Sequence, residues 1–308
     1  MALWQKPTQH SATEAQQSEL FDETFQKRLA ALSLITKRLS RGLQRAERRS
    51  VTTGAGIEFA DHRTYSAGDD YRHIDWNAYA RMGRLLVRMY EQPTDLAVHI
   101  LLDHSASMGF GRPSKLDYAK QLTAALAYIG LRRLDRVGIT AFSERTLTQR
   151  KLARGRQSLW GILDFLHTLP ATGATDLSGA LQSFAAQQRS NGMAIVLSDL
   201  YDPLGFERGI DALRYARFEI HVLQIADPAE WQPALRGDLE LVDAETGATR
   251  SVTVTKSLLS RYTAARHAAQ ERLRAYCRDK HVSLFTLQTS LRVEDALLRL
   301  LRQGGMLR

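Results

Sequence analysis

From Asp95 onward, short apolar runs alternate with amphipathic segments, and this alternation narrows the possible folds more than any other feature. The apolar runs are predicted strands at 96–102, 136–143, 146–152, 193–198, 218–225 and 281–287. Helical periodicity lies between and after them, at 114–133, 156–168, 176–188, 204–216 and 256–280. Short strands separated by helices of this length predict an α/β, Rossmann-like domain whose mainly parallel sheet is covered on both faces.

Two segments depart from this rhythm. The residues around Ser143, Glu144 and Arg145 resemble a tight turn, so the strands on either side predict a hairpin and one antiparallel edge strand. Residues 237–255 hold two β-like runs around Ala244-Glu-Thr-Gly247, which predicts a hairpin inserted before the helix at 256–280.

The N-terminal third is organised differently. Residues 1–18 are polar without apolar periodicity and are expected to form a flexible tail. An amphipathic helix is predicted from about Ser18 to Arg49, followed over 50–94 by a small β-rich subdomain punctuated by glycines. The expected organisation is therefore tail 1–18, helix and β-rich subdomain 19–94, α/β domain 95–290 and C-terminal helix 291–308.

Cysteine content and hydropathy indicate the cellular compartment, and charge indicates the class of partner. The single Cys277 excludes an internal disulfide, no apolar run is long enough to span a membrane, and the N-terminus lacks a secretion signal; we therefore expect a cytoplasmic protein. The net charge is +9, and residues 27–49 hold eight Lys or Arg against Glu47. This basic helix leaves nucleic-acid binding open as an alternative function, although no nucleic-acid motif accompanies it.

Oxygen-bearing side chains follow several of the predicted strands. Asp103, Ser105 and Ser107 come directly after the first strand of the α/β domain. Thr175 opens a later helix, and Asp199 follows the strand at 193–198. Loops at the carboxyl ends of neighbouring parallel strands converge on one crevice. Because carboxylate and hydroxyl oxygens suit a hard divalent cation, the five residues are candidate ligands for Mg²⁺, with Mn²⁺ as an alternative.

This constellation resembles the metal-ion-dependent adhesion site of von Willebrand factor A domains, which reads Asp-x-Ser-x-Ser, then Thr, then Asp. The resemblance implies that Ser105, Ser107 and Thr175 supply hydroxyl oxygens, and that Asp103 and Asp199 act directly or through water. It also implies an open coordination position, which an acidic side chain of a protein partner would fill.

A longer signature lies upstream, in Gly68-Asp69-x-x-Arg72-x-Ile74-Asp75-Trp76. Together with the residues around it, this signature resembles the bacterial family catalogued as domain of unknown function 58, a branch of the von Willebrand A superfamily. The resemblance covers about residues 30–290. It implies a non-enzymatic interaction module and, as partner, an AAA+ ATPase of the MoxR type.

Catalytic functions are less well supported. A serine hydrolase would need Ser105 or Ser107 beside a base. Ser105 lies next to His104, but adjacent side chains of an extended chain point apart, and the sequence has no Gly-x-Ser-x-Gly elbow. A metal-dependent hydrolase remains an alternative, with Asp202 as the nearby candidate base. The charged and aromatic residues of 56–91 are interpreted as an internal ion-pair network, with a docking surface as the alternative.

Overall fold

The computed structural model describes residues 2–3, 21, 49–53, 58–93, 96–133, 135–144, 146–188 and 192–303. The chain divides into two compact units, the larger holding the described residues from 96 onward together with 2–3 and 21, and the smaller holding those between 49 and 93. The helix predicted over 18–49, with its basic face, lies outside the described residues apart from Phe21 and Arg49, as does nearly all of the tail 1–18.

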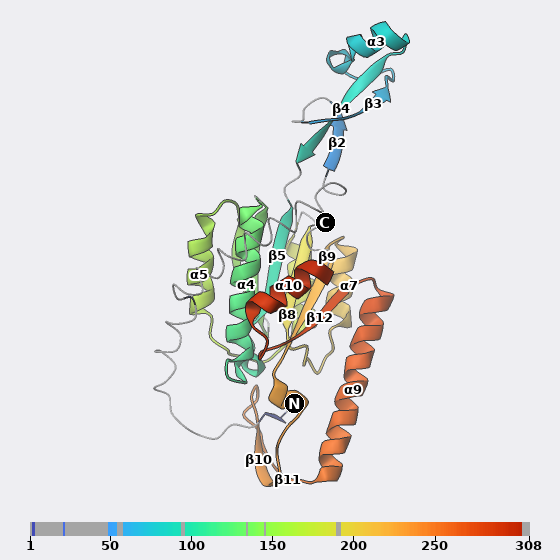
Figure 1. Ribbon diagram of the computed structural model, residues 1–308. Coiled ribbons are helices and arrows are strands. Elements are labelled where there is room, and N and C mark those ends of the chain that lie inside the picture. The colour runs from blue at the N-terminus through green and yellow to red at the C-terminus, as the bar shows by residue number, and fades with distance from the viewer. Residues whose placement is uncertain are drawn as a thin grey trace. The chain divides into compact units, whose positions relative to one another are not determined.

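The larger unit is built on a six-stranded sheet of order β12-β9-β8-β5-β6-β7 (Figure 1). Its strands are β5 (Ala97–Asp103), β6 (Arg136–Ser143), β7 (Thr146–Ala153), β8 (Met193–Ser198), β9 (Glu219–Ala226) and β12 (Ser283–Gln288). All neighbouring strands run parallel except β7, which pairs antiparallel with β6 at the edge. The predicted α/β class, parallel sheet and antiparallel edge strand are thereby confirmed.

Helices cover both faces of this sheet. They are α4 (Lys115–Arg132), α5 (Ser158–Thr168), α6 (Leu177–Gln187), α7 (Glu207–Tyr215), α9 (Lys256–Asp279) and α10 (Val293–Gln303). The helices α6, α7 and α9 share one apolar cluster with the strands, in which Phe184, Leu213 and Cys277 are buried. The helix α4 packs with α5 and α10 and against β5 and β6. Cys277 is therefore a packing residue, as its helical position predicts.

Smaller elements join this frame. The short helix α8 (Pro228–Trp231) was not expected from periodicity and is fixed by a capping box between Asp227 and Glu230. The strands β10 (Gly237–Asp243) and β11 (Thr249–Val254) form the antiparallel hairpin expected over 237–255. At its outer edge, β1 (Ala2–Leu3) pairs with β10. Among the described residues, no helix combines the length and the apolar character needed to cross a bilayer.

The smaller unit is a three-stranded antiparallel sheet of order β2-β4-β3, from β2 (Arg49–Thr53), β3 (Glu58–Thr64) and β4 (Leu86–Pro93). A 3-10 turn, η1 (Tyr71–His73), and a helix, α3 (Trp76–Met82), connect β3 to β4. The helix α3 was missed from sequence because its seven residues are too few to show a helical period.

The signature aspartate Asp75 organises this connection. Its carboxylate accepts hydrogen bonds from Arg88 at 3.0 Å and from the backbone of α3, and it lies 2.9 Å from a ring nitrogen of His62. These contacts, with the Arg88 side chain foremost, hold the pKa of Asp75 well below its usual range. The charged residues of this segment therefore include an ion-pair network as interpreted, while Trp76 and Tyr71 expose 59% and 66% of their surface.

A buried histidine in β5 gives the larger unit a predictable response to acid. The ring of His99 lies edge-on to Phe184 and Phe218, and burial, helped by the charge of Arg136, lowers its pKa from 6.5 to about 4. The unfolded state therefore binds a proton between these two values while the folded state does not, so stability falls as the pH drops through this window. In the wild type, His99 should lower the free energy of unfolding by about 2 kcal/mol as the pH falls from 7 to 4.5. We expect this contribution to be absent in His99→Phe.

Urea denaturation at the two pH values measures this difference. The exposed His267 offers a control, since His267→Gln should leave the pH dependence as in the wild type. Equal pH dependence in His99→Phe and wild type would contradict the assignment.

Candidate metal centre

The predicted ligands meet where the order of the sheet reverses. The strands β5 and β8 are neighbours, and the chain continues from β5 toward β6 on one side and from β8 toward β9 on the other. Leu102 of β5 lies opposite Leu197 of β8, so the loops that begin at Asp103 and Ser198 leave the sheet at the same edge. Such a switch point is the usual ligand site of an open α/β sheet.

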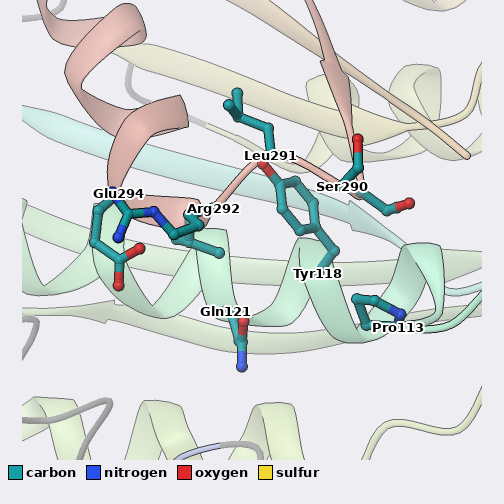
Figure 2. A pocket seen from close by; sticks show the side chains of 9 residues that line it. Pro113, Tyr118, Gln121, Ser290, Leu291, Arg292 and Glu294 are labelled. Atoms are coloured by element: carbon teal, nitrogen blue, oxygen red, sulfur yellow. The ribbon is translucent and has the colours of Figure 1, made fainter. Parts of the chain in front are cut away.

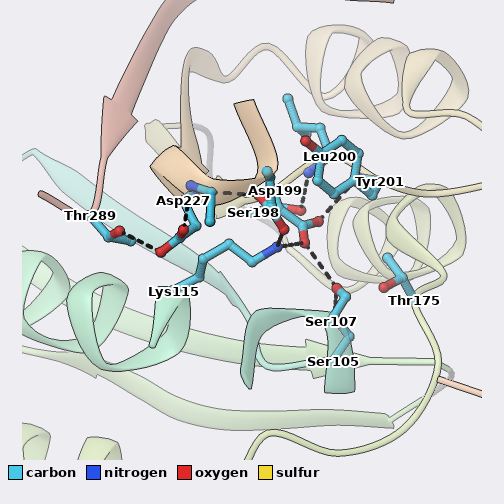
Figure 3. Close-up of polar contacts among 12 residues, drawn as sticks. Ser105, Ser107, Lys115, Thr175, Ser198, Asp199, Leu200, Tyr201, Asp227 and Thr289 are labelled. Atoms are coloured by element: carbon cyan, nitrogen blue, oxygen red, sulfur yellow. Dashed lines mark hydrogen bonds and ion pairs between the residues drawn. The ribbon is translucent and has the colours of Figure 1, made fainter. Parts of the chain in front are cut away.

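Hydrogen bonds join four of the five predicted residues. The hydroxyl oxygens of Ser105 and Ser107 are 3.1 Å apart. The Ser107 hydroxyl donates to Asp199 Oδ2 at 3.0 Å (Figure 3). Asp103 accepts from the backbone N–H of Ser105 at 2.9 Å and from the hydroxyl of Ser198 at 2.7 Å. Asp103, Ser105 and Asp199 are almost completely buried. The structure thus gathers these oxygens in one place; Ser198 was not predicted as part of the site.

Thr175, the fifth residue, lies in a loop that adjoins the Asp103 loop. Its segment is joined to the Asp103 loop by backbone hydrogen bonds from Ala106 to Gly173 and from Thr172 to His104, both 2.9 Å long. The Thr175 hydroxyl donates to Glu245 Oε1 at 2.6 Å, and its backbone N–H donates to Oε2 at 3.2 Å. Glu245 belongs to the turn of the β10–β11 hairpin, and nothing in the local sequence of either residue predicts this contact.

A buried lysine borders the site and was also missed as a functional residue. Lys115 begins α4, as expected, and its Nζ lies 2.6 Å from both Asp199 Oδ2 and Glu230 Oε1 (Figure 3). The Nζ is also 5.2 Å from the centre of the Tyr201 ring. The Lys115 side chain is fully buried, so the ion pairs are shielded from water.

The buried charges shift one another's ionisation. Burial first, and then repulsion from Asp199, raise the pKa of Asp103 above its ordinary value. For Lys115, burial lowers the pKa, but the carboxylates of Asp199 and Glu230 outweigh it, and the pKa is raised. Burial raises the pKa of Glu230 more than the ammonium of Lys115 lowers it. Of the two carboxylates beside the serine hydroxyls, Asp199 thus pairs with the buried ammonium of Lys115, which it shares with Glu230.

The donor set fits Mg²⁺ or Mn²⁺. The site offers neutral hydroxyl oxygens from Ser105 and Ser107 beside the carboxylates of Asp103 and Asp199, and Thr175 adds a hydroxyl from the adjoining loop. Hard divalent cations prefer such oxygen ligands. In the described part of the chain, no cluster of three or more His, Cys, Asp or Glu side chains is suited to a metal. Zn²⁺ chemistry, which relies on His and Cys ligands, is therefore a poor match to this centre.

The residues considered for catalysis are engaged elsewhere. Asp202 accepts backbone hydrogen bonds from Leu204 at 2.7 Å and from Leu177, at the start of α6, at 2.8 Å. A ring nitrogen of His104 lies 2.9 Å from the carbonyl of Pro170. Asp202 therefore stabilises the turn, as its position before Pro203 suggests. His104 is oriented toward the Pro170 carbonyl.

A cavity of about 180 Å³ lies between α4 and the segment that leads into α10 (Figure 2). None of the five predicted ligands lines it. Its volume is below the roughly 300–1,000 Å³ of typical small-molecule sites. At its edge, Thr289 donates to Asp227 at 3.0 Å, which connects the cavity wall to the cap of α8.

Proteins of known sequence and structure resemble this chain. The uncharacterized proteins Rv1480 of Mycobacterium tuberculosis and Mb1516 of Mycobacterium bovis are each 29% identical to it over 259 residues, which cover 82% of this chain and 81% of theirs. Among solved structures, BatB from Bacteroides thetaiotaomicron has a TM-score of 0.43 at 16% identity and covers 69% of this chain and 98% of its own. The SpRpn10 VWA domain has a TM-score of 0.39 at 14% identity, with 67% and 95% covered.

The family assignment rests on the sequence. The family described as "Protein of unknown function DUF58" matches residues 61–273, a stretch that includes the Asp75 signature and all five predicted ligands. The match spans more than half of the chain, in agreement with the resemblance seen in the sequence. The chain therefore belongs to the DUF58 family.

Proposed function

We propose that this protein is a non-enzymatic, Mg²⁺-dependent interaction module. Its metal would be held by Asp103, Ser105, Ser107, Thr175 and Asp199, with Mn²⁺ as a possible substitute. A remaining coordination position would accept an acidic side chain of a protein partner. The observation that best supports this is the chain of hydrogen bonds that runs from Ser105 through Ser107 to Asp199 at the switch point of the sheet.

The physical chemistry favours binding over turnover. A divalent ion beside two carboxylates is close to neutral and can still attract a third carboxylate, whereas hydrolysis also needs a base or a second ion within reach. Asp202 and His104 are engaged with backbone groups. From the resemblance of the chain to its family, we propose an AAA+ ATPase of the MoxR type as the partner.

Capture of a purified MoxR-type ATPase from the same organism tests this function. Because a chelator would also remove metal from the ATPase, the comparison is made between variants at constant Mg²⁺. We expect Ser107→Ala to weaken capture about tenfold, since one metal ligand is lost. Ser178→Ala is the matched control, because Ser178 is as buried as Ser107 but its hydroxyl donates to the carbonyl of Gly205. Equal capture by the two variants would contradict the proposal.

A further inference from the structure

The hairpin β10–β11 presents a carboxylate of the chain itself to the candidate metal centre. Glu245 contacts Thr175 with both oxygens, one accepting from the hydroxyl at 2.6 Å and the other from the backbone N–H at 3.2 Å. Thr175 is 7% exposed, so this contact covers a nearly buried ligand residue. An acidic side chain therefore already lies one hydrogen bond from a predicted metal ligand.

The turn of the hairpin holds Glu245 in this position. The carboxylate of Asp243 accepts from the backbone N–H groups of Glu245 and Thr246, at 2.9 and 3.0 Å. The turn closes through a 2.8 Å hydrogen bond from Asp243 to Ala248, and Gly247 adopts a φ of 71°. A positive φ of this kind is the left-handed conformation, which favours glycine. Gly247 therefore helps to specify the turn that carries Glu245.

The hairpin itself is weakly anchored. It adds no strand to the six-stranded sheet, and among its strand residues only Val254 is counted in the buried core. Segments with few buried apolar contacts open locally at low free-energy cost. The contact between Glu245 and Thr175 can therefore break without unfolding the α/β domain.

From these observations we infer that Glu245 is an internal competitor for the acidic side chain of the partner. In the closed state, Glu245 fills the position beside Thr175; a partner carboxylate binds only when the hairpin moves away. This inference rests on the proposed function, because it assigns the regulation of the same site. It also assigns a regulatory role to the inserted hairpin, which adds no strand to the six-stranded sheet.

The matched variants are Glu245→Gln and Glu240→Gln, which remove the same charge from the same hairpin. Glu240 lies in β10 and is exposed. In the metal-free full-length protein, hydrogen exchange followed by mass spectrometry reports the contact directly. We expect several-fold faster exchange at 171–176 in Glu245→Gln, and wild-type exchange in Glu240→Gln. Unchanged exchange in Glu245→Gln would overturn the inference.

Binding is then measured with Mn²⁺ as the metal and acetate as the carboxylate, using the relaxation of water protons by bound Mn²⁺. One charge-assisted hydrogen bond corresponds to roughly a factor of ten in a two-state equilibrium. We therefore expect Glu245→Gln loaded with Mn²⁺ to bind acetate about tenfold more tightly than wild type, and Glu240→Gln to match wild type. Glu245→Asp, with the charge retained on a shorter side chain, should fall between them.

The two possible failures are distinguishable. If wild type binds Mn²⁺ no better than Asp103→Asn, both the proposed metal centre and this inference are wrong. If wild type binds Mn²⁺ but Glu245→Gln and Glu240→Gln have equal acetate affinities, only the role of Glu245 is wrong, and its contact with Thr175 is purely structural.

Discussion

Asp103→Asn is expected to abolish the stabilisation of the protein by Mg²⁺. A ligand that binds only the folded state, at a concentration of 100 times its Kd, adds about 2.7 kcal/mol to the free energy of unfolding. Wild type should show this gain in urea denaturation with Mg²⁺. The variant should not, because it loses the charge of a fully buried carboxylate next to the serine hydroxyls.

The same experiment separates metal binding from folding. Asparagine keeps an oxygen that can accept from the Ser105 N–H, so the metal-free variant should unfold at nearly the same urea concentration as metal-free wild type. Asp202→Asn is the matched control: its carboxylate caps α6, so the variant should be less stable yet keep the full gain from Mg²⁺. A Mg²⁺-dependent gain in Asp103→Asn equal to that of wild type would remove Asp103 from the site.

The second large effect is expected from Lys115→Met. Methionine preserves much of the apolar stem but removes the ammonium that Asp199 and Glu230 share. Removing one partner of a buried ion pair leaves an uncompensated charge and costs about 3–5 kcal/mol. We expect a loss of this size in the free energy of unfolding, measured by urea denaturation at pH 7 without metal.

Lys120→Met provides the comparison. Lys120 is also buried in α4, but burial lowers its pKa, whereas the two carboxylates raise that of Lys115. Its replacement should therefore cost less than about 1 kcal/mol, the range of substitutions that break no ion-pair network. Similar losses in the two variants would show that the contacts of Lys115 contribute little to stability.

Lys115 also limits how a metal can use Asp199. Its ammonium contacts Oδ2, the same oxygen that accepts from Ser107, while Oδ1 accepts from the backbone N–H of Tyr201 at 3.1 Å. Both oxygens of Asp199 thus have protein partners. A metal at this centre would therefore bind Asp199 through a water or by replacing one of these hydrogen bonds.

Periodicity was sufficient to predict most of the larger unit. The strands at 136–143 and 193–198 have the predicted bounds, because each is a mainly apolar run that ends at a serine. The parallel order then placed Asp103 and Asp199 at one edge, since strands of this type end on the same side of the sheet. Grouping the predicted ligands required no knowledge of side-chain contacts.

Long-range side-chain pairing could not be predicted in this way. Lys115 pairs with residues 84 and 115 positions away, and Thr175 with one 70 positions away. Each of these side chains also has an ordinary local interpretation, as the start of a helix, a capping residue or a turn residue. The short helix α3 was not predicted for a different reason. Seven residues within a β-rich segment show too little periodicity to distinguish a helix from a loop.

The most direct measurement is anomalous X-ray diffraction from crystals of the full-length protein grown with Mn²⁺. We predict an anomalous peak within about 2.3 Å of the hydroxyl oxygens of Ser105 and Ser107, at the carboxyl ends of β5 and β8. A peak at another place on the molecule, or no peak at a Mn²⁺ concentration that saturates binding in solution, would contradict the proposed metal centre.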